Sequence, residues 1–223
     1  SQPVTSRALD RLRAASLPYV LAYNRHADHP CVSVDNETAV IEMVARLVAL
    51  GHRRIAFISG ELAASDRALQ RQRGFCEGMQ AHGLDTYVCL EVPFIETAIQ
   101  DIGALLDTPG RPTALVCSND LIAIRSIRAA HLAGLTVPRD ISVAGFDGIA
   151  LGRDLTPALS TITQPNQAIG RDSVQWLVAA LASGQPLAPH ASRLLPHAFR
   201  TGESCTTAPD SPSFLRDAPA LLP

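Results

Sequence analysis

The segment from Thr113 to Asp147 constrains the fold more strongly than any other part of the chain. Two very apolar runs, Thr113 to Cys117 and Ile141 to Gly145, flank a helix-like stretch from Leu121 to Leu132. This order predicts a strand–helix–strand unit, and polar Asn or Asp residues follow both strands. In open α/β sheets, ligands bind in the crevice outside the carboxyl ends of the strands. The segment therefore predicts a small-molecule site.

The same alternation of apolar runs and helix-like stretches extends over most of the chain. Strands that alternate with helices of ten or more residues imply an α/β fold with parallel, doubly wound sheets. Pro, Ser, Ala and Asp dominate from Cys205 onward, which predicts a loose tail. The other predicted strands are Tyr19 to Tyr23, Val32 to Val34, Ile55 to Ser59, Tyr87 to Glu91, Ser160 to Thr163 and Arg193 to Phe199, and the other predicted helices are Ala8 to Ala15, Thr38 to Leu50, Ser65 to His82, Glu96 to Leu106 and Ala168 to Leu181.

The charged residues exclude several functional classes. The formal net charge is −2, and no basic stripe suggests that this segment itself contacts nucleic acid. All 19 cationic residues are arginine, so the chain has no lysine for a phosphate loop, a Schiff base or a Ser–Lys nucleophile pair. Gly-x-Ser-x-Gly, a glycine-rich dinucleotide loop and His-x-x-x-His are absent as well. Nothing supports an enzyme, and no motif indicates a cofactor.

The five cysteines are widely spaced and form no Cys-x-x-Cys motif, so neither a zinc site nor a redox motif is indicated. Cys76, Cys89 and Cys117 lie in apolar runs and are expected to act as small core residues in a reducing cytoplasm. No apolar run approaches the length of a membrane span, and no secretory leader opens the chain. Residues 1–13 resemble the middle of a domain, which predicts that the chain is a fragment.

Short motifs follow one another in a fixed order along the chain. They are Val34-Asp35-Asn36, Leu50 to Gly60, Arg71-x-x-Gly74-Phe75, Cys117 to Asp120, Gly134 with Val137-Pro138, Asp140 to Asp147, Thr161 to Pro165 with Ile169-Gly170, and Arg200 to Ser204. Their order and spacing together resemble the core domain of LacI/GalR-type transcriptional regulators, from about Ser6 to Ser204. The closing element, Arg200 to Ser204, is one residue longer than the Arg-x-x-Ser of that family.

This resemblance implies a periplasmic-binding-protein-like core of two lobes. The chain passes from one lobe to the other three times. We place the crossings near Gly51, Gln164 and Leu187. The amino-terminal lobe is then residues 1–50 and 165–188, the carboxyl-terminal lobe is residues 51–164 and 189–205, and residues 206–223 form a flexible tail. In the family a helix-turn-helix, a hinge helix and the first strands of the core precede the position of Ser1, so the first lobe is expected to be incomplete.

The resemblance also implies partners. It indicates a small polar effector, with a sugar favoured, that binds in the cleft between the two lobes of the chain. It also indicates that the regulator is a cytoplasmic homodimer. Operator DNA would be bound only through an amino-terminal domain that is absent from this chain, and no membrane is involved. Two alternatives stay open: a solute-binding protein of a transport system, which shares the two-lobe architecture, and an enzyme on the same framework.

Asp147 and Asn119 are the first candidates for ligand contact. Asp147 lies at the end of a strand, where a carboxylate can accept hydrogen bonds from vicinal hydroxyls or from a ligand amine. Both residues could instead cap the helices that follow them, because Asp and Asn are favoured caps. Of the neighbouring pair Asn119 and Asp120, we expect Asp120 to be the cap.

Arg71 is the candidate from the next helix along the chain. Its planar guanidinium suits a carboxylate, a phosphate or a pair of hydroxyls. A solvated helix arginine is the alternative, because Arg67 and Arg73 are close in sequence, but the resemblance selects Arg71. Ser65, Asp66 and Arg67, at the start of the same helix, are secondary candidates.

Phe94, Asp35 and Asn36 complete the candidate site. Phe94 follows a strand and could stack on a sugar or base ring, or it could pack in the core. Asp35 and Asn36 stand at the end of a first-lobe strand and face the cleft by the strand-end rule. The motif His26-x-Asp28-His29 lacks a further group at zinc spacing, so no metal site is predicted. His52 follows the carboxyl-terminal end of a predicted helix, where the helix dipole stabilises a cation.

Overall fold

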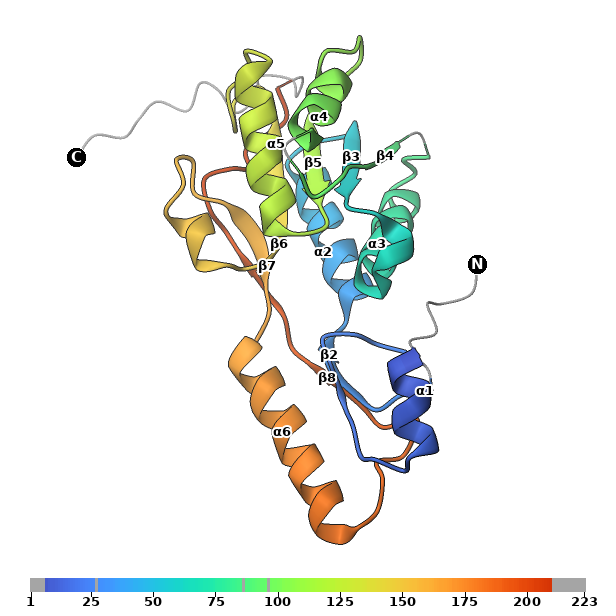
Figure 1. Ribbon diagram of the computed structural model, residues 1–223. Helices are drawn as coiled ribbons and strands as arrows, with labels where there is room; N and C mark the ends of the chain where they lie inside the picture. Colours follow the sequence, from blue (N-terminus) through green and yellow to red (C-terminus); the bar gives the residue numbers. More distant parts are fainter. Residues whose placement is uncertain (1–6, 27, 86, 96, 210–223) are drawn as a thin grey trace, which may run out of the picture.

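The computed structural model describes residues 7–26, 28–85, 87–95 and 97–209, and this part of the chain contains two sheets. In Figure 1 a larger sheet with helices on both sides lies above a smaller sheet that is flanked by α1 and α6. The helices are α1 (Arg7–Ala14), α2 (Asn36–Ala49), α3 (Asp66–Ala81), α4 (Ala98–Leu106), α5 (Asp120–Leu132) and α6 (Asn166–Ser183), with short 3-10 helices at Leu62–Ala64 and Ala150–Arg153.

The larger sheet has the strand order β4-β3-β5-β6-β7-β9. All neighbouring pairs are parallel except β7 and β9, which are antiparallel. The smaller sheet has the order β1-β2-β8 and is parallel throughout. This architecture confirms the predicted α/β fold with parallel sheets. The strands are β1 (Leu21–Ala22), β2 (Cys31–Val34), β3 (Ile55–Ser59), β4 (Val88–Glu91), β5 (Ala114–Cys117), β6 (Ser142–Asp147), β7 (Ser160–Thr163), β8 (Ser192–Leu195) and β9 (Ala198–Arg200).

The central strands of the larger sheet are apolar on both faces because helices cover both faces. Along β3, Ile55 and Phe57 pack with α2 and α3, whereas Ala56 and Ile58 pack with α4 and α5. The alternation has a period of two residues, as expected for a strand. The carboxyl ends of β3, β5 and β6 therefore meet at one edge of a rigid, well-packed layer.

The first crossing between the sheets differs from the prediction. We expected it near Gly51, but the chain leaves the smaller sheet at Val34 and enters α2 at Asn36. The apolar face of α2, which includes Val40 and Met43, belongs to the core around β3 and α3. The apolar stripe of a helix shows which core the helix packs against, so α2 belongs with the larger sheet. The chain therefore does not change sheets at Gly51, where this helix ends.

The last crossing also lies elsewhere than predicted. Strand β8 pairs with β2 in the smaller sheet, whereas β9 pairs with β7 in the larger one. The crossing is therefore between Leu195 and Ala198, rather than near Leu187, and the predicted strand Arg193 to Phe199 is two strands. Pro196 stands between them, and a proline has no backbone N–H to continue a ladder. The remaining connection, at Gln164, joins β7 to α6.

Two local predictions also change. Cys117 is buried as expected, but Cys89 is exposed because β4 is an edge strand. The part of the predicted flexible tail that the structure describes is held in place, since the N–H of Ala208 donates to the carbonyl of Leu50 at 2.8 Å and Ala208 is buried. Residues 210–223 lie outside the described residues.

His52 is buried beneath the starts of β5 and β6, so it does not act as an exposed cation at a helix end as the sequence suggested. Its Nδ1 lies 2.9 Å from the hydroxyl of Thr113, and its Nε2 lies 3.1 Å from the hydroxyl of Ser142 and 3.0 Å from the carbonyl oxygen of Thr206. Burial lowers the pKa of His52 below its ordinary value of 6.5, because it disfavours the charged imidazolium.

We expect the free energy of unfolding to fall as the pH drops below about 6.5 and to be insensitive to this group at higher pH. The folded-state pKa of His52 is depressed, so the unfolded chain binds the proton more readily in this window. For one proton the slope cannot exceed about 1.4 kcal/mol per pH unit. The free energy of unfolding, measured in urea between neutral and mildly acidic pH, should depend less on pH in His52→Gln than in the parent. In the exposed His82→Gln the pH dependence should match that of the parent. Equal slopes for His52→Gln and the parent would contradict this assignment.

Candidate functional site

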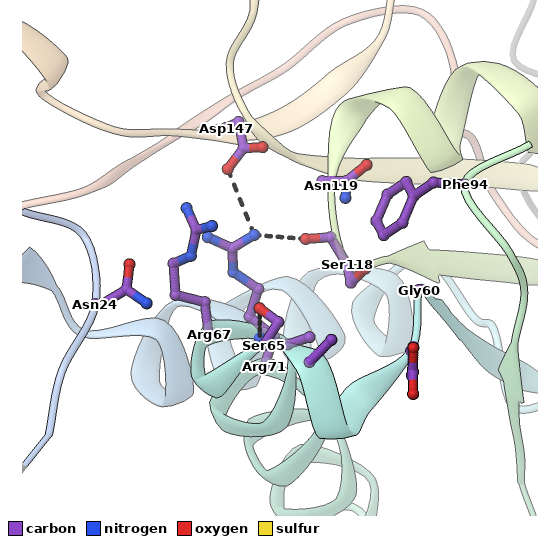
Figure 2. A pocket seen from close by; sticks show the side chains of 12 residues that line it. Asn24, Gly60, Ser65, Arg67, Arg71, Phe94, Ser118, Asn119 and Asp147 are labelled. Carbon is purple, nitrogen blue, oxygen red and sulfur yellow. Dashed lines mark hydrogen bonds and ion pairs between the residues drawn. The ribbon is translucent and has the colours of Figure 1, made fainter. Parts of the chain in front are cut away.

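A cavity of about 280 Å³ lies where β3, β5 and β6 end, and Figure 2 shows its side chains. Residues from the starts of α3 and α5 and from the loops after the three strands surround it. The lining residues are Asn24, Gly60, Glu61, Ala64, Ser65, Arg67, Ala68, Arg71, Phe94, Ser118, Asn119 and Asp147. The structure thus brings five of the eight predicted site residues together: Arg67, Arg71, Phe94, Asn119 and Asp147.

Arg71 is the central cation of the cavity and is only 4% exposed. Its Nε donates to Oδ1 of Asn36 at 2.9 Å, and its Nη1 donates to the carbonyl oxygen of Ser118 at 2.5 Å. Nη1 also lies 3.4 Å from Oδ1 of Asp147, and the guanidinium carbon lies 3.6 Å from the ring centroid of Phe146. Burial lowers the pKa of Arg71 to about 10, and the nearby carboxylate of Asp147 opposes that shift. The guanidinium is therefore charged at neutral pH and held in one orientation.

Asp147 ends β6 with an unusual backbone, at a φ of 114°. A non-glycine residue in such a region costs roughly 1–3 kcal/mol and persists only where the surrounding structure enforces it. Its Oδ1 accepts a hydrogen bond from Nε2 of Gln164 at 2.8 Å, and a third of its side chain stays exposed toward the cavity. Burial raises the pKa of the Asp147 carboxyl, while the charge of Arg71 opposes the rise. The strained backbone presents the carboxylate to the cavity.

Asn119 lines the cavity and also caps α5. Its Oδ1 accepts a hydrogen bond from the N–H of Ile122 at 2.9 Å, which leaves the amide nitrogen as a donor. Asp120, which we expected to be the cap, is fully buried: its Oδ1 accepts from the hydroxyl of Thr161 at 2.5 Å and its Oδ2 from the N–H of Ile149 at 2.8 Å. Asp120 therefore ties α5 to β7 and to the loop after β6.

Phe94 is 54% exposed at the cavity, so it is not a core residue. Its ring lies against Gly60, where a Cβ atom would come within 2.1 Å of the ring. A glycine at this strand end is thus required for the ring to reach its place beside Asn119 (Figure 2). An exposed aromatic face beside polar side chains suits a ring-shaped ligand.

Arg67 lies beside Arg71 in Figure 2, one helical turn earlier on α3. Its Nε is buried without a hydrogen-bond partner among the described residues, and the same is true of Nη2 of Arg71. A buried N–H without an acceptor costs about 1–3 kcal/mol, and more when the group is charged. Two donors at this cavity thus lack the oxygen atoms that would satisfy them.

The other three predicted residues do not line the cavity. Asp66 binds Nδ2 of Asn24 at 2.7 Å and the N–H of Arg25 at 2.8 Å, which holds the loop after β1 against α3. Asp35 caps α2 by accepting from a backbone N–H at 3.1 Å. Asn36 is buried behind Arg71 and holds its Nε. A short polar side chain that follows a strand can cap or brace as readily as it can face a ligand.

The sequence reasoning missed Asn24, Gly60, Glu61 and Ser118 as lining residues. Gly60 and Ser118 directly follow β3 and β5, so the strand-end rule applied to Asp147 would have found them. Gln164, which braces Asp147, was noted only as a crossing residue. No local signal in the sequence shows that this amide reaches the carboxylate.

The chain is similar to known proteins over most of its length. The periplasmic binding protein-like domain family matches residues 44–205. The chain belongs to this family. It is 30% identical over 179 residues to catabolite control protein A of Priestia megaterium, which covers 78% of this chain and 54% of that protein. It is 36% identical over 135 residues to the ribose operon repressor of Haemophilus influenzae, which covers 59% of this chain and 40% of that protein.

A solved structure of a dimeric Lac repressor with a C-terminal deletion matches with a TM-score of 0.80 at 27% identity, covering 93% of this chain and 76% of that one. The resemblance to the effector-binding core of LacI/GalR-type regulators is therefore confirmed. These relatives of the periplasmic binding protein-like chain are named as regulators and repressors. The chain spans about half the length of the curated relatives it matches.

Within the described ranges, no group of three or more His, Cys, Asp or Glu side chains could hold a metal ion. Nor is any helix in that same part of the chain both long and apolar enough to span a membrane.

Proposed function

We propose that the chain senses a sugar-like effector for a LacI/GalR-type transcriptional regulator. The observation that carries this proposal is the ion pair between the buried Arg71 and the half-buried Asp147, which faces a cavity at the strand ends beside an exposed aromatic ring. A carboxylate and a guanidinium can together bind vicinal hydroxyls, because one accepts and the other donates. The amide of Asn119 adds a further donor. One relative is named after the ribose operon, which agrees with a sugar.

Ligand binding would favour one arrangement of two lobes, one built on each sheet. The residues around the cavity support this, because Asn24 follows a strand of the smaller sheet and the other polar residues follow strands or begin helices of the larger one. A ligand that contacts both lobes stabilises the arrangement in which both contacts form. In the whole regulator, which we propose to be a cytoplasmic homodimer, this change would reach the operator-binding domains. The names of the relatives favour a regulator over a solute-binding protein of a transport system.

We expect Phe94→Ala to weaken sugar binding roughly 3- to 10-fold, because it removes the stacking face but no polar contact. A thermal-shift screen of neutral and acidic sugars would first identify the effector, and isothermal titration would then give its affinity for each variant. Ile95→Ala is the matched control, since Ile95 is 61% exposed and next in sequence but does not line the cavity. The proposal fails if no sugar shifts the melting temperature, or if a sugar is turned over instead of bound.

A further inference from the structure

We infer that the effector carries a carboxylate, which Arg67 binds, so that the ligand is a hydroxylated monocarboxylic acid of sugar size. This inference rests on the proposed sensing function and specifies the ligand of that same cavity. It begins from Arg67, whose Nε is buried at the cavity without an acceptor among the described residues. The resemblance to regulators predicts that Arg71 binds the ligand, whereas the surroundings of Arg67 indicate the charge of the ligand.

The two arginines that line the cavity differ in their ion pairs. Arg71 has Asp147 as its partner at 3.4 Å, but no carboxylate in the described part of the chain forms an ion pair with Arg67. Asp66, next to Arg67 in sequence, is already bound by Asn24 and a backbone N–H. Glu61 also lines the cavity, but it is exposed, and water and salt screen an exposed charge. Arg67 is therefore the cation of the cavity that has no ion-pair partner among the described residues.

The two unsatisfied donors belong to neighbouring guanidinium groups. Nη2 of Arg71 and Nε of Arg67 are both buried and unsatisfied, and their guanidinium groups lie side by side in Figure 2. Two adjacent cations repel each other, and an anion that accepts from both removes the repulsion and the unsatisfied N–H groups together. The two oxygens of a carboxylate can each accept one of these N–H groups.

Two helices also begin at the cavity. Ser65 is the N-cap of α3 and Asn119 is the N-cap of α5, and both residues line the cavity. The amino-terminal end of a helix carries a partial positive charge that stabilises an anion nearby. One unpaired arginine with two helix ends suits a single negative charge. A phosphate dianion would bring a second charge close to the carboxylate of Asp147, so a carboxylate is favoured.

Isothermal titration with paired sugars tests this inference on the chain as it stands. D-Glucuronate and D-gluconate are compared with D-glucose, D-galacturonate and D-galactonate with D-galactose, and D-glucose 6-phosphate serves as the phosphorylated probe. We expect at least one acid to bind about tenfold or more tightly than its neutral parent, and higher salt to reduce the difference. A neutral parent that binds as tightly as its acids, or a phosphate that binds more tightly than every acid, would overturn the carboxylate. Saturable binding by none of the neutral or anionic probes would instead overturn the proposed sugar-sensing function.

The variant Arg67→Gln tests the assigned residue. We expect it to weaken binding of the acid roughly 10- to 100-fold and to leave the affinity for the neutral parent within about twofold, so that the preference disappears. Arg73→Gln is the matched control: it removes the same charge from the same helix, but Arg73 is exposed and pairs with Glu37 at 3.2 Å. If Arg67→Gln loses affinity equally for the acid and for the neutral sugar, or still prefers the acid as strongly as the parent does, Arg67 does not bind the carboxylate.

Discussion

Arg71→Met is expected to lower effector affinity at least about 100-fold, the largest effect on binding that the structure predicts. Methionine fills much of the same space, but it leaves the carboxylate of Asp147 without its cation and the amide oxygen of Asn36 without its donor. Truncating one partner of a hydrogen-bonded charge pair at a binding site typically costs 2–5 kcal/mol or more. Isothermal titration measures the loss, and Arg128→Met, on an exposed position of α5, is the control. Retained affinity in Arg71→Met would remove this cavity as the effector site.

The same substitution should also destabilise the fold. Breaking a fully buried pair costs about 3–5 kcal/mol, but Asp147 keeps a third of its side chain exposed, so we expect about 1–3 kcal/mol in urea unfolding. Loss of binding could then be mistaken for loss of structure. Asp147→Asn separates the two effects, because asparagine keeps an oxygen for Gln164 and tolerates a positive φ better than alanine does. We expect Asp147→Asn to lose less stability than Arg71→Met, because the amide oxygen still accepts from Gln164, and to bind at least tenfold more weakly.

Gly74→Ala is expected to cause the largest loss of stability, about 2–3 kcal/mol. Helices α2 and α3 touch at this glycine: a Cβ atom there would lie 2.3 Å from the carbonyl oxygen of Glu37 and 2.8 Å from its Cα. Both atoms belong to backbone in the first turn of α2, which cannot move aside as the end of a side chain can. The helices must therefore separate, and the contact between Asn36 and Arg71, at the same end of α2, is disturbed with them.

Gly103→Ala provides the matched control for Gly74→Ala. Gly103 lies inside α4, and a Cβ atom added there meets nothing within 4 Å. Alanine favours a helix over glycine by roughly 0.5–1 kcal/mol, so this variant should be slightly more stable than the parent. Urea unfolding of the two variants compares the same chemical change in crowded and in open surroundings. A Gly74→Ala protein as stable as the parent would show that the helices can adjust at this contact.

The position of the site could be predicted from the sequence because the strand-end rule uses only the order of the elements. Buried apolar runs located β3, β5 and β6, and the candidates lie at two of their ends: Asn119 is two residues after β5, and Asp147 is the last residue of β6. The rule fails to say what a strand-end side chain does. Asn119 and Asp120 are adjacent and chemically similar, yet one lines the cavity and the other is buried against Thr161. Their roles depend on which elements pack nearby.

The crossings were harder to predict for a related reason. The pattern of α2 shows an apolar stripe, but it does not say which sheet the stripe will cover, and the glycine at the end of the helix suggested a boundary there. The actual boundary is the single residue Asp35, between the end of β2 at Val34 and the start of α2 at Asn36. Likewise, one apolar run from Arg193 to Phe199 divides between two sheets at Pro196. Such divisions follow from tertiary packing, which local periodicity does not record.

The bracing of Arg71 by Asn36 and of Asp147 by Gln164 has a consequence for anyone who would convert this protein into a biosensor for another compound. Each brace lies on a segment that joins the two sheets, so exchanging either charged residue alters the joints as well as the recognition. Phe94 and Arg67 have no such connection and could be varied in a library at little structural risk. Selectivity should thus be engineered at the rim of the cavity, with the central ion pair kept as a fixed anchor.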